Sequence, residues 1–428
     1  MAAPLLLDLS HTCHTRARTG IQRVARSLRA ALGEAAIEVT YDPYRRAWRT
    51  LQPWEVANLQ ASAPATKRGA RWPLAARWGG RAARWIGTGA ELPTPNAGLV
   101  VPELFSATVG AAFPRLFAAT TGPRVAIFHD AIGLKLPELT PTKTVARLPA
   151  YLQELRQFDG IAAVSNDSRA ALVDYWRWLG WERTPPVEVI PLGVDVPVPT
   201  PEREPVAARE PPATREPVAM REPVAMRESA ATREPAAARE PVAARESAAA
   251  RPIVLCVGTL EGRKNHAPLL EACERLWQRG LDFELHLVGL ANAETGRAAL
   301  ARIEALQRAG RPVVYLGPVD ETELAASYAR CAFTVYPSLM EGFGLPVLES
   351  LAHGKPCICS AHGALAEAAA GGGCITVEPV DATSLAEAMH RGLSDSTLRE
   401  RLLAEVRQRT FRTWSMYADD LSAWMSDL

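Results

Sequence analysis

The sequence lacks several features that would have decided its class at once. Its seven cysteines are odd in number and contain no Cys-x-x-Cys pair, so we interpret them as reduced core residues of a cytosolic protein. No apolar run approaches the ~18 residues of a membrane span. The 48 basic and 47 acidic residues nearly cancel. The overall charge therefore gives no reason to expect a nucleic-acid partner.

What the chain does contain is a joint between a predicted strand, a glycine loop and a predicted helix. The apolar run 332–336 is typical of a strand in a parallel sheet. Gly342 and Gly344 follow it and let the backbone approach a ligand. Pro346 suits the first turn of a helix over about residues 346–353. The free N–H groups and the dipole at this helix N-terminus favour a phosphate.

Two carboxylates flank this predicted anion site. Glu341 precedes the loop, and Glu349 lies one turn inside the helix. Because carboxylates repel a phosphate, we expect them to contact neutral hydroxyls or developing positive charge, as a sugar nucleotide would offer. The pair, with Gly-Phe-Gly-Leu-Pro between its members, resembles the paired-glutamate signature of the retaining glycosyltransferases of family 4. The neighbouring Pro337-Ser338 and Ala352-His-Gly-Lys-Pro356 also fit.

The resemblance covers most of residues 5–200 and 251–420. It implies an α/β protein of the GT-B fold, in which two Rossmann-like doubly wound domains face a central cleft. We expect an acceptor-binding domain over 1–200 and a nucleotide-sugar-binding domain over 251–410. The last segment, 411–428, resembles the helix that returns to the first domain in this fold. A chain of 428 residues is also long enough for two cores.

Between the two predicted domains lies a repeat. Arg-Glu recurs every six residues from Arg203-Glu204 to Arg245-Glu246, and proline follows most of these pairs. Proline interrupts any helix, the charges cancel and few large apolar residues are present. We interpret 203–250 as a flexible linker. The family normally crosses here with a short connection, so this segment departs from its pattern.

The start of the chain is patterned as a strand, a loop and a helix. A predicted strand over 5–9 and a helix after Gly20 enclose a loop with His11 and His14. Spacing alone permits these histidines to bind a metal, but no third ligand is evident and we assign no metal. Thr19-Gly-Ile-Gln-Arg23 resembles the family's glycine loop that faces the cleft. This places Gly20 near the donor.

His129 follows the predicted strand 124–128. Ligands of doubly wound sheets gather at the carboxyl ends of the strands. The resemblance places a histidine at this strand end, beside donor and acceptor. We therefore include His129 in the catalytic set and describe it as a positioning group.

In the second half, a predicted strand over 253–257 is followed by Gly258 and then by Arg263 and Lys264. Departure of a diphosphate requires positive charge, and no Asp-x-Asp motif that would hold a metal follows a strand. We expect Arg263 and Lys264 to bind the phosphates. No Gly-x-Gly-x-x-Gly follows a strand, which argues against a redox dinucleotide enzyme. We predict no cofactor beyond the nucleotide-sugar donor.

These inferences give two overlapping sets of site residues. The catalytic set is His129, Arg263, Lys264 and Glu341. The donor-binding set is Gly20, Gly258, Arg263, Lys264, Gly342, Phe343, Gly344, Leu345 and Glu349. Within it, the resemblance assigns the ribose hydroxyls to Glu349.

Residues 66–86 combine cations with tryptophans and contain no acid. The residues concerned are Lys67, Arg68, Arg71, Trp72, Arg77, Trp78, Arg81, Arg84 and Trp85. This composition suits the interface of an anionic membrane. A nucleic-acid patch and a solvated helix are the alternatives. We expect Pro73, Gly79 and Gly80 to interrupt any single long helix here.

The loop 19–23 resembles that of bacterial transferases that build O-antigen and other surface polysaccharides, many of which use GDP-mannose. We expect a metal-independent, retaining hexosyltransferase acting on a glycan or lipid-linked acceptor, with GDP favoured over UDP and dTDP. The apolar run Pro4–Leu7 is too short for a signal-peptide core. A cytoplasmic protein with peripheral membrane contact is therefore expected. The alternatives are a GT-B-fold sugar-nucleotide epimerase or phosphorylase, and a non-catalytic binding protein of a polysaccharide-assembly complex.

Overall fold

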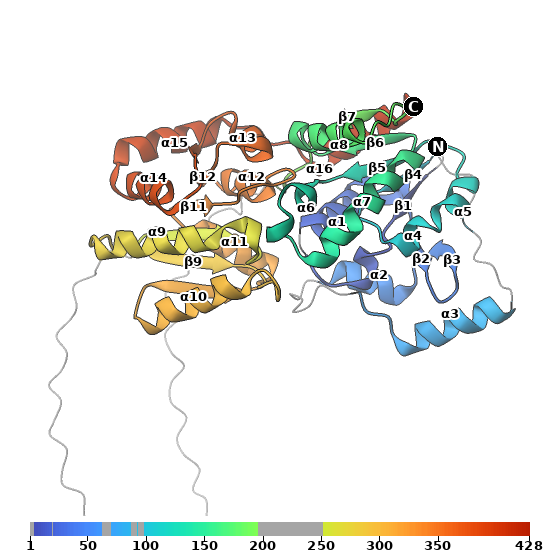
Figure 1. Ribbon diagram of the computed structural model, residues 1–428, viewed down its shortest axis with the longest axis horizontal. Coiled ribbons are helices and arrows are strands. Elements are labelled where there is room, and N and C mark those ends of the chain that lie inside the picture. The colour runs from blue at the N-terminus through green and yellow to red at the C-terminus, as the bar shows by residue number, and fades with distance from the viewer. Residues whose placement is uncertain (1–3, 19, 62–69, 87–91, 93–97, 196–250) are drawn as a thin grey trace, which may run out of the picture. The chain divides into compact units, whose positions relative to one another are not determined.

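The computed structural model describes residues 4–18, 20–61, 70–86, 92, 98–195 and 251–428. Strands and helices alternate along the chain and form two separate sheets (Figure 1). The predictions for the linker 203–250, and for Thr19, Lys67 and Arg68, lie outside the described residues.

The first sheet has seven strands in the order β3-β2-β1-β4-β5-β6-β7. Its neighbouring strands are parallel except for β2 and β3, which form an antiparallel pair. The central strands are almost wholly apolar and buried, as expected for a sheet covered on both faces. The strands are β1 (Leu5–Asp8), β2 (Ala36–Asp42), β3 (Ala47–Thr50), β4 (Leu99–Val101), β5 (Arg124–Phe128), β6 (Gly160–Ala163) and β7 (Val187–Val189).

The second sheet has six strands in the order β10-β9-β8-β11-β12-β13, and every neighbouring pair is parallel. Its core combines apolar side chains of β8, β9 and β11 with those of α9 and α14. The strands are β8 (Ile253–Val257), β9 (Glu284–Val288), β10 (Val313–Gly317), β11 (Phe333–Tyr336), β12 (Cys357–Ser360) and β13 (Cys374–Val377).

Helices connect successive parallel strands, as parallel pairing requires. Those of the first half are α1 (Gly20–Leu32), α2 (Pro53–Gln60), α3 (Leu74–Ile86), α4 (Ala107–Gly110), α5 (Phe113–Ala118), α6 (Ile132–Lys135), α7 (Thr142–Glu154) and α8 (Asn166–Trp178). Those of the second half are α9 (His266–Gln278), α10 (Arg297–Arg308), α11 (Glu321–Arg330), α12 (Leu345–Ala352), α13 (Gly363–Ala369), α14 (Ala382–Ser394), α15 (Ser396–Gln408) and α16 (Trp414–Ser426). Short 3₁₀ turns include η1 (Thr12–His14) and η5 (Gly262–Lys264).

Both sheets are doubly wound, because the strand order reverses between β1 and β4 and again between β8 and β11. Loops that leave the carboxyl ends of strands diverge at such a reversal and leave a crevice for a ligand. The predicted cationic segment follows β8, and the predicted glycine loop follows β11. The topology therefore places these two parts of the site side by side.

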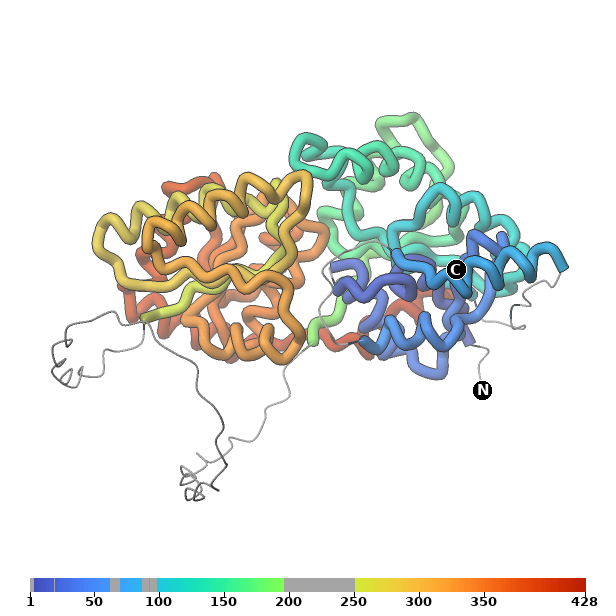
Figure 2. Tube along the Cα trace, turned by 90° about the horizontal axis from the view of Figure 1, so that it is seen from below, coloured from blue at the N-terminus to red at the C-terminus, as the bar shows by residue number. Residues whose placement is uncertain are grey.

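The last helix belongs to the core of the first half. In Figure 2 the C-terminal end of the trace lies among the blue N-terminal segments. Helix α16 packs against α1, and its buried Tyr417 and Leu421 join a cluster with Leu7 and Val24. The chain thus leaves the first half once and returns to it.

One local prediction was wrong. Residues 74–86 form the single helix α3, although Gly79 and Gly80 lie inside it. Tertiary packing outweighs the low helix propensity of glycine here. A Cβ at Gly80 would lie 2.9 Å from the Cβ of Tyr44, so only glycine lets α3 approach the turn between β2 and β3 this closely.

The cysteines agree with the expectation of reduced core residues. All seven are free, and six of them are buried. Across the residues that the structure describes, no helix combines the length and the apolar character needed to cross a membrane.

Candidate active site

A cavity of about 600 Å³ is lined by loops that follow strands of both sheets. It brings together most of the predicted site, although these residues come from five separate segments of the chain. The predicted residues that line it are Gly20, His129, Gly258, Arg263, Lys264, Glu341, Gly342, Phe343, Gly344 and Leu345. Glu349 does not line it.

The cationic segment is held by a tight turn. After β8 the chain forms η5, and Asn265 adopts a left-handed conformation with φ of 57° before α9 begins. Arg263 and Lys264 then meet Glu341 from the loop after β11. Arg263 Nη1 lies 2.7 Å and Lys264 Nζ 2.6 Å from Glu341 Oε1. Arg263 Nη2 also lies 2.8 Å from Glu261.

The charges in this cluster stabilise one another. Burial opposes ionisation of Glu341, but the nearby Arg263 and Lys264 outweigh it and lower its pKa to about 2. Burial lowers the pKa of Lys264, and the attraction of Glu341 opposes that shift. Two cations and two acids give the cluster no net charge.

Three side chains contact the same oxygen of the Glu341 carboxylate. Arg263, Lys264 and the hydroxyl of Ser338 all contact Oε1. The Tyr336 side chain also interacts with the Glu341 carboxylate. The carboxylate borders the cavity, where it can accept a hydrogen bond from a ligand hydroxyl.

Helix α12 begins at the cavity. Gly344 precedes it with φ of +93°, a left-handed conformation that favours glycine. Pro346 occupies the first turn, where its missing N–H leaves no bond unmade. Phe343 and Leu345 line the cavity and also pack against the apolar cluster of the first half. They therefore help to fix the loop as well as border the ligand space.

Gly342 lines the cavity and also lies close to another backbone segment. A Cβ at this position would lie 2.2 Å from the carbonyl oxygen of His129. Glycine at this position is therefore required by the contact between two backbone segments of the protein, and its predicted contact with the donor stays a prediction. The Gly342 carbonyl also accepts hydrogen bonds from Ser165 Oγ at 2.6 Å and Ser168 Oγ at 3.0 Å.

Glu349 lies behind Arg23. The Arg23 Nη2 atom is 2.5 Å from Glu349 Oε1, and the Tyr328 hydroxyl donates to Glu349 Oε2 at 3.3 Å. The carboxylate is 4% exposed, and its attraction raises the pKa of Arg23. Arg23 lines the cavity. A ribose could reach Glu349 only after Arg23 moves aside.

His129 lies at the end of β5 and is buried. Its Nε2 is 2.7 Å from the Pro102 carbonyl oxygen, which can only accept, so Nε2 carries the proton. Burial lowers the pKa of His129, which keeps the ring neutral near pH 7. Nδ1 is then an unprotonated acceptor.

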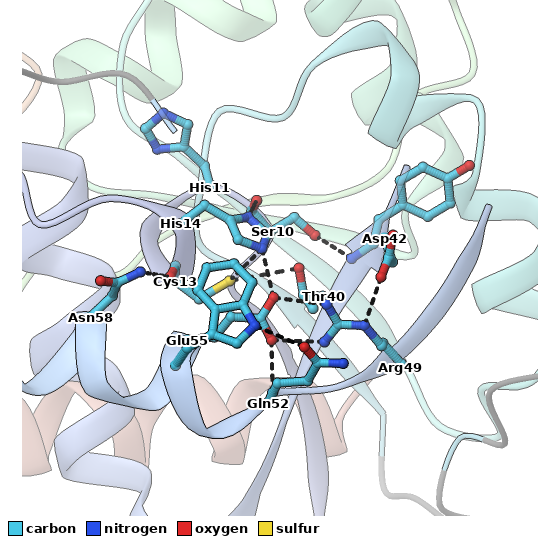
Figure 3. Close-up of polar contacts among 12 residues, drawn as sticks. Ser10, His11, Cys13, His14, Thr40, Asp42, Arg49, Gln52, Glu55 and Asn58 are labelled. Atoms are coloured by element: carbon cyan, nitrogen blue, oxygen red, sulfur yellow. Dashed lines mark hydrogen bonds and ion pairs between the residues drawn. The ribbon is translucent and has the colours of Figure 1, made fainter. Parts of the chain in front are cut away.

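A buried polar cluster supports the loop that carries His11 (Figure 3). His14 Nε2 lies 2.7 Å from Glu55 Oε1 and 3.5 Å from Cys13 Sγ. Arg49 binds both Glu55 oxygens, at 2.7 and 2.9 Å, and contacts Asp42 at 3.0 Å. These bonds outweigh burial and lower the pKa of Glu55 to about 2.

Of the two histidines that spacing permits as metal ligands, His14 lies in a cluster of possible ligands, and His11 does not belong to that cluster. The side-chain donor atoms of Cys13, His14 and Glu55 lie within 4.8 Å of one another. Glu55 is remote in sequence, so spacing could not reveal it. Its two oxygens are already bound by the Arg49 guanidinium, which would repel an added cation. We interpret the cluster as a structural network.

Sequence reasoning also missed Arg147 on α7. It lines the cavity, its Nε is buried, and no described residue forms a hydrogen bond with that atom. Burial lowers the pKa of Arg147. The sequence does not reveal that an arginine in a helix lines a cavity, because the tertiary packing of the helix decides which of its faces borders the cavity.

Residues 251–395 match the protein family described as glycosyl transferases group 1. This part of the chain is a group 1 glycosyltransferase domain. The domain includes Arg263, Lys264, Glu341 and the loop before α12. The O-antigen chain mannosyltransferase B of Escherichia coli is 34% identical over 159 residues, which are 36% of this chain and 41% of that protein. The match thus spans less than half of that relative.

Solved structures resemble the whole chain. Sucrose-phosphate synthase from Thermosynechococcus elongatus superposes with a TM-score of 0.62 at 18% identity, covering 99% of this chain and 98% of that one. Anabaena HepE in complex with UDP-glucose superposes with a TM-score of 0.62 at 15% identity and full coverage of both chains. At these identities the likeness concerns the fold. It confirms the predicted α/β architecture of two Rossmann-like halves, the GT-B fold.

Proposed function

We propose that this protein is a retaining glycosyltransferase that transfers mannose from GDP-mannose to a glycan or lipid-linked acceptor of a bacterial surface polysaccharide. The observation that carries the proposal is the cluster of Arg263, Lys264 and Glu341 beside the N-terminus of α12. It lies within the glycosyltransferase domain and lines the cavity. The mannosyltransferase among the relatives supports the choice of sugar.

The diphosphate of the donor would bind between η5 and α12. Because Glu341 and Glu261 already offset Arg263 and Lys264, the phosphate charge must be met by the N–H donors that these acids leave unused. In the first turn of α12, Pro346 has no N–H group, and the Val347 and Leu348 N–H groups donate to the Gly344 carbonyl. The Leu345 amide is the further donor there, and the helix dipole favours an anion at this end. Together these groups would stabilise the charge that develops on the departing diphosphate.

The sugar would lie between Glu341 and His129. Glu341 stays ionised because its pKa is about 2, and its carboxylate can accept a hydrogen bond from a sugar hydroxyl or face developing positive charge at the anomeric carbon. His129 Nδ1 can accept a hydroxyl proton in a hydrogen bond and so position the sugar. Glu349 would bind the ribose once Arg23 has moved.

A nucleotide panel tests the choice of donor. We expect GDP at 100 times its Kd to stabilise the folded protein by about 2.7 kcal/mol, which corresponds to a rise in Tm of roughly 5–10 °C. UDP and dTDP should give smaller shifts, and GMP, which lacks the second phosphate, serves as the matched control. Transfer of mannose from GDP-mannose to a lipid extract is then measured directly.

Two results would change this proposal in different ways. A strong rise in Tm with UDP and none with GDP would contradict GDP-mannose as the donor. The proposal of a glycosyltransferase would stand. An absence of any shift with every nucleotide diphosphate would contradict donor binding in this cavity.

We also expect sugar transfer to continue in excess EDTA. Arg263 and Lys264 provide N–H donors at the diphosphate, and no Asp-x-Asp motif follows a strand. The measurement is the initial rate with and without chelator. If the rate collapses and Mg²⁺ or Mn²⁺ restores it, the leaving group depends on a metal and this assignment is wrong.

A further inference from the structure

We propose that α3 is an interfacial helix that docks this protein on an anionic lipid bilayer. The helix presents large apolar side chains to solvent: Leu74 is 70% exposed, Trp78 65%, Trp85 94% and Ile86 76%. Leu74, Trp78 and Trp85 are spaced by four and seven residues, so they share one face of the helix. Tryptophan at a water-exposed helix face is typical of membrane interfaces.

Small residues make the opposite face. Ala76, Gly80 and Ala83 are spaced by four and three residues, and Gly80 and Ala83 are buried. They hold α3 close to the turn between β2 and β3. Because the underside of the helix is anchored by small residues, its large apolar side chains are left outside the core. In Figure 1 α3 lies at the lower margin of the first half.

Arginines border the apolar stripe. Arg77, Arg81 and Arg84 are again four and three residues apart and form a cationic edge. Arg81 lies 5.3 Å from the ring centre of Trp78 and 5.7 Å from that of Tyr44. No acidic residue occurs between Glu55 and Glu91 to offset this charge. An apolar stripe beside a cationic edge is complementary to acyl chains beside anionic headgroups.

One tryptophan of the predicted membrane surface, Trp72, packs against the protein instead. Trp72 stacks on His14 with ring centres 4.1 Å apart. The Arg71 N–H donates to the His14 carbonyl at 2.8 Å. These contacts tie the start of α3 to the loop that carries His11, and His11 lines the cavity. Docking through α3 would therefore hold this side of the cavity near the bilayer.

This inference deepens the proposed function by assigning the source of a lipid-linked acceptor, and its test needs no donor and no activity. The full-length protein is sedimented with vesicles of phosphatidylglycerol and phosphatidylethanolamine, or of phosphatidylcholine alone. We expect binding to the anionic vesicles only, at least 10-fold weaker at 0.5 M salt because exposed charges are screened. Changing Arg77, Arg81 and Arg84 to Gln should weaken binding roughly 10- to 100-fold.

A second variant tests the apolar stripe. Trp78→Ser with Trp85→Ser should weaken binding at least 10-fold without lowering Tm, because both side chains are exposed. Trp178→Ser is the matched control: Trp178 is 79% exposed, but it lies on α8. It should bind like the parent protein.

Four outcomes overturn the proposal. They are equal binding to both kinds of vesicle, no binding to either, equal loss in the Trp178 control, and binding to duplex DNA without binding to vesicles. None of these outcomes concerns sugar transfer in solution. A result that contradicts membrane docking can therefore be distinguished from one that contradicts the proposed glycosyltransferase.

Discussion

Replacing Lys264 by methionine is expected to lower the rate of sugar transfer by about 10²- to 10³-fold, the usual cost of removing one preorganised charged donor from a developing anion. Lys264 is buried and contacts Glu341 at 2.6 Å inside the cavity. Methionine is one heavy atom shorter than lysine, so it keeps most of the apolar side chain while removing the charge and its three donors. Affinity for the nucleotide diphosphate should fall by about 1–3 kcal/mol.

The measurements are initial rates with saturating donor and calorimetry with the nucleotide diphosphate. Lys355→Met is the control, because Lys355 lies in the same half and its ammonium bonds the carbonyls of Ala329 and Cys331 outside the cavity. Thermal melting checks that both variants fold. A rate within twofold of the parent, with unchanged nucleotide affinity, would show that Lys264 does not act on the leaving group.

The sequence predicted the parts of the site that depend on short stretches of chain. The strand at 253–257 and the helix near 346–353 both appear within one residue of their expected bounds. Such elements follow from apolar runs bounded by glycine and proline, which act over a few residues. That Lys264 and Glu341 border the same crevice could also be anticipated, since they follow the two adjacent strands at which the strand order reverses.

Contacts set by tertiary packing could not be predicted. Arg23 and Glu349 are more than three hundred positions apart in the chain, and no periodicity connects them. Glycine at 342 permits a close approach of a ligand or of the protein itself. The sequence does not say that the His129 carbonyl is one of the groups that approach it. The Gly79-Gly80 pair likewise predicted a break in the helix, because helix propensity takes no account of the packing of α3 on Tyr44.

The largest loss of stability is expected from Arg49→Met. Arg49 is 4% exposed and binds two carboxylates, Asp42 and Glu55, which are 3% and 0% exposed. Removing their shared cation leaves two buried carboxylates without a guanidinium partner. Asp42 then keeps only the backbone N–H groups of Tyr44 and Arg45, and Glu55 keeps the Gln52 N–H group and His14. Leaving a buried charge unpaired costs about 3–5 kcal/mol. In a half of this size that corresponds to a fall in Tm of roughly 6–20 °C.

Two further variants separate charge from packing. Arg177→Met removes an arginine whose side chain is 72% exposed and whose partner is Asp174; exposed pairs contribute about 0–1 kcal/mol, so its Tm should change little. Adding Asp42→Asn and Glu55→Gln to Arg49→Met removes the uncompensated charges and should recover much of the lost Tm. If the triple variant melts no higher than Arg49→Met, the loss comes from packing of the guanidinium against Trp72, which it faces at 5.8 Å. In that case the network does not stabilise the His11 loop through its charges.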